Sequence, residues 1–293
     1  MEKINKLKKL FNYYNLDGYI VPKNDEFFGE YIPKNKDKLK FISNFSGSYG
    51  FALILKNKNY LFVDGRYTLQ AKIQSGKFFD IVTIPKRFPS DVLKKKRLKI
   101  GFDPRLYTQK TLKIFFNKTN CKLININQNL IDKLWIKKEN SNLKRFYILP
   151  QKAVGQNYRL KINKLINVLN KKKIDFQFIS ASENIAWLLN IRGQDSEFTP
   201  MPNAYLALDS NKKINLFCDL KKIEYSFKKK FKDIKFIDIK YTDLFLTKIK
   251  NKKILIDSSS CSIYFENILK KNNKITEFLD PIYFLKSIKS KIE

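Results

Sequence analysis

Apolar residues follow a helical period at the start of the chain and then gather in short runs. Ile4, Leu7 and Phe11 share one face of a helix, because they recur at intervals of three and four residues. The dipeptide Asp17-Gly18 then ends the helical pattern, as turn-forming residues do. The pattern predicts strands over residues 19–21, 51–55, 60–63 and 98–102, a helix that begins near residue 66, and a helix around residues 112–116. Helices and strands therefore alternate, and a mixed α/β architecture is expected.

The second half of the chain repeats this order. Ile162, Leu165 and Leu169 form a helical face that leads to Asp175 and an apolar run, as the first helix leads to Asp17. Three further pairs of segments correspond in the same order: 44–47 with 190–193, 61–64 with 216–219, and 100–103 with 254–257. Four ordered matches at similar offsets predict a duplication. We therefore expect two domains, over residues 1–150 and 151–293, joined within the polar stretch 137–154.

The chain is strongly basic. Its 293 residues include 59 Lys and Arg but only 27 Asp and Glu, which gives a formal net charge of +32. Only seven of the basic residues are arginine, and the surplus is spread over both halves. A nucleic-acid reader would instead cluster Arg and Lys on one face, with aromatic residues between them. We expect solvated lysine faces and no specific nucleic-acid partner, and a basic nucleic-acid binder stays open as a third hypothesis.

The chain has no histidine, which excludes nucleophiles activated by histidine and metal sites that need an imidazole ligand. Its three cysteines, Cys121, Cys218 and Cys261, lack the CxxC spacing of zinc and redox motifs, and we expect them to be reduced and buried. No apolar stretch approaches the ~18 residues of a membrane span, and the amino terminus lacks the apolar core of a signal peptide. A cytoplasmic protein without a membrane partner is expected.

Two turns carry the candidate chemistry. Asp64, Arg66 and Tyr67 follow a predicted strand, where α/β sheets expose ligand-binding loops. The planar guanidinium of Arg66 could clamp a carboxylate with two hydrogen bonds, or it could pair locally with Asp64 and fix the turn. Arg192, in the second half, faces the same choice. The residues leave both alternatives open at both turns.

Longer motifs extend around these turns. They occupy residues 18–22, 25–26, 29–33, 45–48 and 61–67 in the first half, and 185–195, 199–202, 280–282 and 286–289 in the second. Together they resemble the two amino-terminal domains of the long, three-domain form of Xaa-Pro aminopeptidase, of the creatinase/prolidase family. Arg66 and Tyr67 match the family's Asp-Gly-Arg-Tyr motif, and Arg192 matches its Asn-Ile-Arg-Gly motif. The resemblance covers essentially the whole chain.

The resemblance implies a fold and a set of partners. Two tandem, duplicated creatinase-type amino-terminal domains, each a mixed β-sheet flanked by helices, would precede a carboxy-terminal pita-bread catalytic domain that is absent from this sequence. In the family, that third domain holds two divalent metals, usually manganese, which activate a water for attack on the bond before proline. The amino-terminal domains wall the active-site cleft and contribute to subunit assembly. The implied partners are the catalytic domain, covalent or separate, Xaa-Pro peptides and a second subunit.

The sequence stops where the third domain should begin and contains no histidine, so the resemblance supplies no catalytic and no metal-ligating residue here. We expect the non-catalytic amino-terminal region of a Xaa-Pro aminopeptidase, inactive by itself. Asp64, Arg66, Tyr67 and Arg192 are expected to face the substrate cleft or an interface. The alternative is a stand-alone peptide-binding or interaction module that has lost catalysis.

Overall fold

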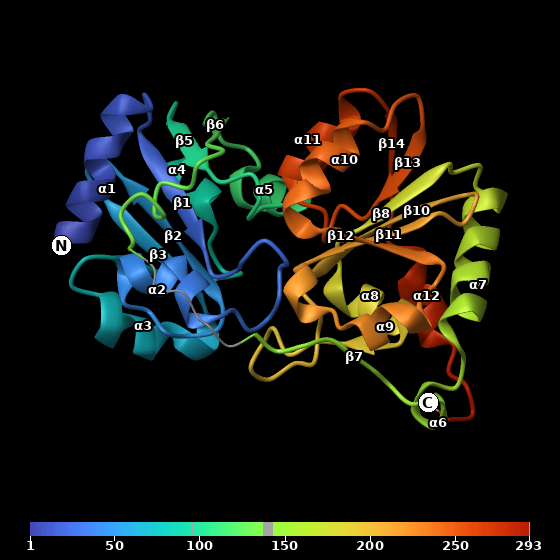
Figure 1. The fold of residues 1–293 in the computed structure, drawn as a ribbon. Helices are drawn as coiled ribbons and strands as arrows, with labels where there is room; N and C mark the ends of the chain where they lie inside the picture. The colour runs from blue at the N-terminus through green and yellow to red at the C-terminus, as the bar shows by residue number, and fades with distance from the viewer. Residues whose placement is uncertain (95, 137–142, 293) are drawn as a thin grey trace. The chain divides into compact units, whose positions relative to one another are not determined.

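The computed structural model describes residues 1–94, 96–136 and 143–292. The chain divides into two compact α/β units, which Figure 1 shows as ribbons. The first unit contains Met1–Glu26 and Ile32–Asn140, and the second contains Phe27–Tyr31 and Ser141–Glu293. In the second unit, the Phe27 ring stacks on Tyr205 with the ring centroids 5.1 Å apart. The short segment 27–31 is therefore part of the second unit by its packing.

The first unit is built on a six-stranded mixed sheet. Its strands are β1 (Gly18–Pro22), β2 (Gly50–Leu55), β3 (Asn59–Asp64), β4 (Asp80–Ile84), β5 (Lys99–Phe102) and β6 (Lys122–Asn125). They lie in the order β4-β3-β2-β1-β5-β6, and β1 pairs antiparallel with β2 and parallel with β5. The helices are α1 (Glu2–Tyr13), α2 (Lys38–Ser43), α3 (Thr68–Ser75), α4 (Pro89–Leu93) and α5 (Gln109–Phe116), with 3₁₀ turns η1 (Lys34–Lys36) and η2 (Gly65–Tyr67).

The second unit repeats this topology. Its sheet contains β8 (Phe176–Ile179), β10 (Ala204–Asp209), β11 (Ile214–Cys218), β12 (Ile234–Asp238), β13 (Lys253–Ile256) and β14 (Lys274–Glu277), in the order β12-β11-β10-β8-β13-β14. Its helices are α6 (Gln151–Val154), α7 (Tyr158–Lys171), α8 (Ser182–Leu189), α9 (Tyr225–Lys230), α10 (Thr242–Thr247), α11 (Ile263–Lys270) and α12 (Pro281–Ser287), with 3₁₀ turns η3 (Leu220–Lys222) and η4 (Ile239–Tyr241). A separate antiparallel pair joins β7 (Tyr147–Ile148) to β9 (Ile191–Arg192). The matching strand orders confirm the predicted duplication.

Equivalent polar residues hold corresponding parts of the two sheets. The carboxylate of Asp17 accepts the backbone N–H of Lys99 at 2.9 Å, and that of Asp175 accepts the backbone N–H of Lys253 at 2.7 Å. Each bond ties the turn before the central strand to the start of its parallel neighbour. Asn44 ends α2 and Asn190 ends α8, both in the left-handed conformation that such caps favour. The segment pairs matched in the sequence therefore occupy equivalent places in the fold.

Helices cover both faces of each sheet, and each unit has its own core. In the first unit, α1 buries Leu7 and Phe11 against one face, and α5 stacks Phe115 on Phe51 of the other, with ring centroids 4.1 Å apart. In the second unit, α7, α8 and α12 pack on one face and α10 and α11 on the other (Figure 1). This burial of the apolar helix faces supplies the main favourable free energy of folding.

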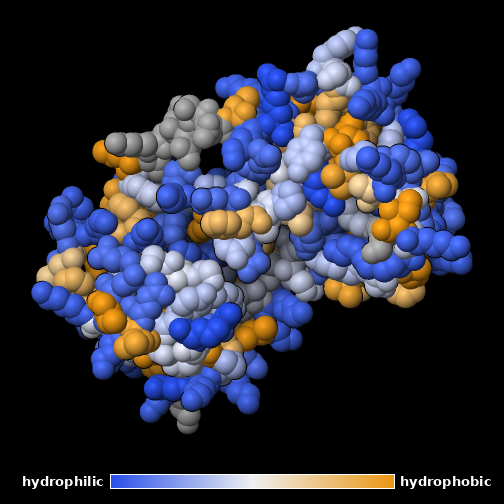
Figure 2. Space-filling model, turned by 90° about the horizontal axis from the view of Figure 1, so that it is seen from below, coloured by the Kyte–Doolittle hydropathy of each residue, from blue (hydrophilic) through white to orange (hydrophobic). Residues whose placement is uncertain are grey.

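The outer surface is mostly polar. Figure 2 shows hydrophilic residues over most of the face in view, with hydrophobic residues in small separate groups. Within the described ranges, no helix combines the length and the apolar composition needed to cross a bilayer.

Candidate functional site

The turn after β3 is closed by a local ion pair. The Asp64 carboxylate accepts the backbone N–H of Arg66 at 2.9 Å and its side-chain Nε–H, also at 2.9 Å. These hydrogen bonds lower the pKa of the Asp64 carboxyl below its usual range. The Arg66 side chain is 74% exposed. Of the two alternatives posed by the sequence, the local pair with Asp64 is present, and contact with a ligand stays a prediction.

Tyr67 joins this turn to a second motif. Its hydroxyl lies 2.7 Å from the Ser48 hydroxyl, and its ring packs edge-on against Phe45 with the centroids 6.0 Å apart. A Cβ at Gly47 would lie 2.3 Å from the Phe45 ring and 3.0 Å from the Tyr67 ring. Only glycine fits between these rings without a shift. The motif segments 45–48 and 61–67 thus form one packed structure in the first unit.

Helix α3 extends this structure with exposed apolar side chains. Leu69 is 72% exposed and Ile73 is 76% exposed, one turn apart on the helix. The neighbouring polar row is hydrogen-bonded, because Gln70 and Gln74 each donate to the Ser46 hydroxyl at 2.9 Å. Arg66, whose turn is fixed by hydrogen bonds to Asp64, thus directly precedes a helix that exposes Leu69 and Ile73 to solvent.

Arg192 is held differently. Its Nη1 donates to the backbone carbonyls of Ala186 at 3.1 Å and Ile191 at 2.9 Å, so the guanidinium caps the carboxy-terminal end of α8. A cation at this end of a helix is favoured by the helix dipole. The side chain is half-buried, and this burial lowers the pKa of Arg192. The turn that contains Arg192 is therefore tied to α8 through its own side chain.

A close backbone contact fixes the rest of this turn. A Cβ at Gly193 would lie 2.7 Å from the Pro202 Cα and 2.8 Å from the Met201 carbonyl oxygen. The Gly193 N–H also donates to the Pro200 carbonyl at 3.2 Å. The motif segments 190–193 and 199–202 thus pack directly against each other, which explains the glycine.

The structure also shows a buried lysine that the sequence analysis missed. Lys161 is only 1% exposed, and its ammonium donates to the Asn190 side-chain oxygen at 2.6 Å and to the Trp187 carbonyl at 3.0 Å. The signal was available, since Lys161 precedes Ile162 on the apolar face of α7 and lies one turn before Leu165. Its role is to hold the end of α8 and hence the turn of Arg192.

The four predicted site residues belong to two different units. Asp64, Arg66 and Tyr67 lie together in the first unit, and Arg192 lies in the second. Within the part of the chain that the structure describes, no group of three or more Cys, Asp or Glu side chains is placed to hold a metal ion. Cys218 and Cys261 are buried as predicted, whereas Cys121 is only half-buried, so the prediction of burial was wrong there.

Comparison with known proteins identifies the family of both units. Two models of the creatinase/prolidase N-terminal domain match, one over residues 3–134 and the other over residues 137–293. The chain belongs to the creatinase/prolidase N-terminal domain family. The fold class expected from the sequence, two tandem domains of this type, is confirmed.

Similar proteins with the same domains are about twice as long. The probable Xaa-Pro aminopeptidase P of Laccaria bicolor is 29% identical over 310 aligned residues, which cover 100% of this chain and 48% of that protein. The Xaa-Pro aminopeptidase 1 of Dictyostelium discoideum is 30% identical, with 100% and 49% covered. The predicted resemblance to Xaa-Pro aminopeptidases is thus confirmed, and the chain spans about half the length of the curated relatives it matches.

A solved structure has the same fold. The X-prolyl aminopeptidase of Caenorhabditis elegans, a cytosolic enzyme with a di-nuclear active site, superposes with a TM-score of 0.87. The aligned region covers 99% of this creatinase/prolidase-type chain and 52% of that chain, at 23% identity. This match supports the fold of both units.

Proposed function

We propose that this chain is the non-catalytic amino-terminal region of a Xaa-Pro aminopeptidase, an enzyme that removes the residue before proline from the amino end of a peptide. The observation that carries the proposal is the alignment of the whole chain with about half of each of two such enzymes. Both halves of the chain match family models for amino-terminal domains. We also propose that the chain acts in the cytoplasm, since the similar X-prolyl aminopeptidase of C. elegans is a cytosolic enzyme.

The chemistry belongs, in this proposal, to the part of the relatives that this chain does not span. There a dinuclear site, with manganese as the proposed metal, would supply the activated water. The described residues of this chain do not fit such a site, because they bring no three potential ligands together. We therefore assign no step of the hydrolysis to them, and propose that the chain by itself is inactive.

We assign to the first unit a contact with the catalytic domain or a second subunit. The exposed Arg66, Leu69 and Ile73 support this assignment, since they combine a fixed cation with apolar surface. Tyr67 and Asp64 would hold this surface in shape through their hydrogen bonds. Arg192 would act in the second unit by positioning the turn that it caps. Xaa-Pro peptides would be bound between these domains and the catalytic domain.

A peptidase assay with two proteins tests the proposal. The purified 293-residue chain and the native enzyme captured from the source cell are each given a peptide with proline at position two, with and without Mn²⁺. We expect release of the first residue by the native enzyme only. Metal-dependent turnover by the 293-residue chain would overturn the proposal.

The contact of Arg66 is tested in the native-length enzyme. Arg66→Ala should weaken assembly or raise KM by about 10-fold, the cost of one charge-assisted hydrogen bond. Arg87→Ala is the matched control, because Arg87 is an exposed arginine of the same unit outside the motifs. Equal behaviour of the two variants would refute the assignment of Arg66.

A further inference from the structure

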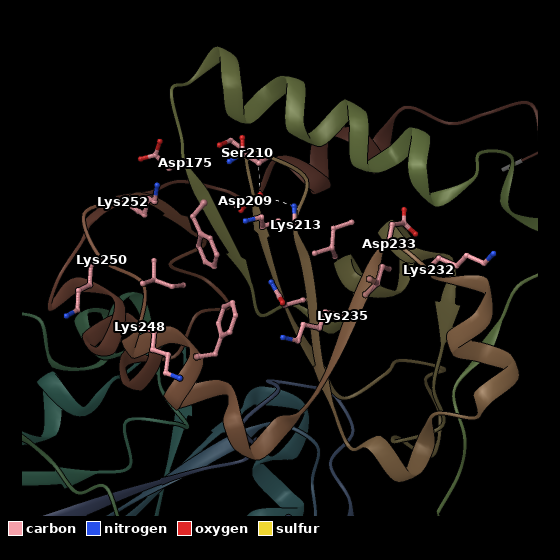
Figure 3. A pocket seen from close by; sticks show the side chains of 17 residues that line it. Asp175, Asp209, Ser210, Lys213, Lys232, Asp233, Lys235, Lys248, Lys250 and Lys252 are labelled. Atoms are coloured by element: carbon pink, nitrogen blue, oxygen red, sulfur yellow. Dashed lines mark hydrogen bonds between the residues drawn. The ribbon is translucent and has the colours of Figure 1, made fainter.

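The second unit contains a pocket at the end of its sheet opposite to the Asp219 turn. Its volume is about 760 Å³, within the range of small-molecule sites. It is bounded by the start of β8, the β10–β11 hairpin, the start of β12 and the segment from α10 to β13 (Figure 3). Six lysines line this pocket, which we call the lysine pocket: Lys213, Lys232, Lys235, Lys248, Lys250 and Lys252.

The aspartates of the lysine pocket are engaged elsewhere. Asp209 accepts the backbone N–H groups of Asn211 at 2.9 Å and Lys213 at 2.8 Å, which closes the β10–β11 hairpin. Asp233 accepts hydrogen bonds from the Tyr158 hydroxyl and the Arg159 guanidinium of α7. Asp175 accepts the backbone N–H that starts β13. Each carboxylate thus serves local structure.

The six lysines, in contrast, make no ion pair with any described residue. In Figure 3, Lys213, Lys235 and Lys248 lie around the apolar side chains of the pocket, whereas Lys232 extends away from it. The six ammonium groups outnumber the three carboxylates of the lysine pocket, so their mutual repulsion is only partly compensated, and an anion that enters would relieve the rest.

The first unit provides an internal comparison. At the corresponding end of its sheet, Lys56 pairs with Asp17 at 3.0 Å and Lys58 pairs with Asp80 at 2.7 Å. Asp17 and Asp175 are equivalent by their identical hydrogen bonds to the next strand. The first unit therefore pairs two lysines of this hairpin end with aspartates, whereas the six lysines of the lysine pocket in the second unit have no carboxylate partner among the described residues.

The composition of the lysine pocket selects the kind of anion. Because positive charges are in excess there, a ligand with several negative charges is favoured, and polyphosphates carry such charges on compact groups that ammonium ions bind as point charges. No arginine lines the lysine pocket among the described residues, so these contacts would come from lysine alone. Phe176, Phe245 and Ile249 add apolar surface. We propose that the lysine pocket binds an organic phosphate with two or more phosphate groups, whose apolar part packs on these side chains.

ATP and inorganic triphosphate are the probes for this site, titrated calorimetrically into the 293-residue chain at 0.15 M salt. We expect saturable binding of one ATP per chain, and weaker binding of triphosphate, which lacks an apolar part. The triple variant K213A/K235A/K248A should lose at least about 50-fold in ATP affinity, since each charge-assisted contact contributes several-fold.

The matched control is K228A/K229A/K230A, which removes three exposed lysines of the same unit that do not line the pocket. Its ATP affinity should change by less than about 3-fold, because these lysines do not line the pocket and interactions between exposed charges are weakened by salt. An equal loss in both triples would show a general field effect and overturn the proposal, as would the failure of both probes to bind. Equal affinity for ATP and triphosphate would overturn the role of the apolar side chains.

Hydrogen exchange on the unmodified chain gives a check that needs no variant. ATP should slow exchange in peptides that cover residues 209–215 and 245–252 and leave residues 225–230 unchanged. Protection confined to other segments would place the anion elsewhere and contradict the assignment.

Discussion

Replacement of Gly193 by alanine tests how the turn of Arg192 is held. The added Cβ would meet the Pro202 Cα at 2.7 Å and the Met201 carbonyl oxygen at 2.8 Å. Contacts between carbon atoms are optimal at about 3.5–4.0 Å, so the two backbone segments must separate by about 1 Å. Both neighbours are main chain, and neither can turn away as a flexible side chain would.

Overpacking of this kind costs about 1–3 kcal/mol in unfolding free energy. The shift also strains the hydrogen bond from the Gly193 N–H to the Pro200 carbonyl, which is 3.2 Å long. We expect Gly193→Ala to lie in the upper half of that range. Gly65→Ala is the matched control in the other turn, since its Cβ would meet no atom nearer than 3.8 Å. Gly65→Ala should be neutral or stabilising by about 0.5 kcal/mol, because alanine lowers the conformational entropy of the unfolded chain.

Urea unfolding followed by tryptophan fluorescence measures this difference. The chain has two tryptophans, Trp135 in the first unit and Trp187 in the second, so a Trp135→Phe background reports on the second unit alone. Gly65→Ala is measured in the complementary Trp187→Phe background. Equal midpoints for Gly193→Ala and its parent would refute the close-contact argument for this turn.

Three further predictions concern single side chains. Burial raises the pKa of the Cys218 thiol to about 12 and that of Cys261 well above its usual value, so a thiol reagent at pH 8 should modify Cys121 in the folded chain, with the other two reacting only in urea. The backbone N–H of Lys99 at the start of β5 lowers the pKa of Asp17, so Asp17→Asn should destabilise the chain at pH 7. In a series of urea titrations the difference from wild type should shrink once the pH falls below about 4 and be lost as the pH falls through the lowered pKa of Asp17. Lys161→Met removes a buried donor to the end of α8 and should cost about 2 kcal/mol, whereas a loss below 0.5 kcal/mol would contradict its assigned role.

The periodicity of the sequence predicted most of the central elements of each unit. Buried strands such as β2 and β5 appear in the sequence as apolar runs between turn residues, and the spacing of apolar residues in α1 is that of an amphipathic helix. The duplication could be predicted because both halves have Asp and Asn at equivalent turns. The two aspartates, Asp17 and Asp175, accept equivalent backbone N–H groups. Strands β4, β6, β12 and β14 were not predicted, and neither was the central strand β10 of the second unit. The first four lie at the sheet edges, where partial exposure of β6 and β14 weakens the apolar pattern.

The candidate site was predicted in part. The Asp64–Arg66 pair could be anticipated, since the two side chains are two residues apart at a turn. Arg192 could not be placed, because its partners are carbonyls of α8 whose position depends on the packing of that helix. The lysine pocket had no sequence signal at all. Its lysines come from separate strands and loops, and in so basic a chain only the fold distinguishes them from other surface lysines.

The measurement that tests the central proposal most directly is the intact mass of the native polypeptide, captured from the source cell with an antibody against this chain. The 293 residues account for 34.8 kDa. Since the relatives are about twice as long, we predict a mass near twice that value and Xaa-Pro peptidase activity in the same fraction. A native mass of 34.8 kDa, with no peptidase captured alongside it, would contradict the proposal that these domains serve a Xaa-Pro aminopeptidase.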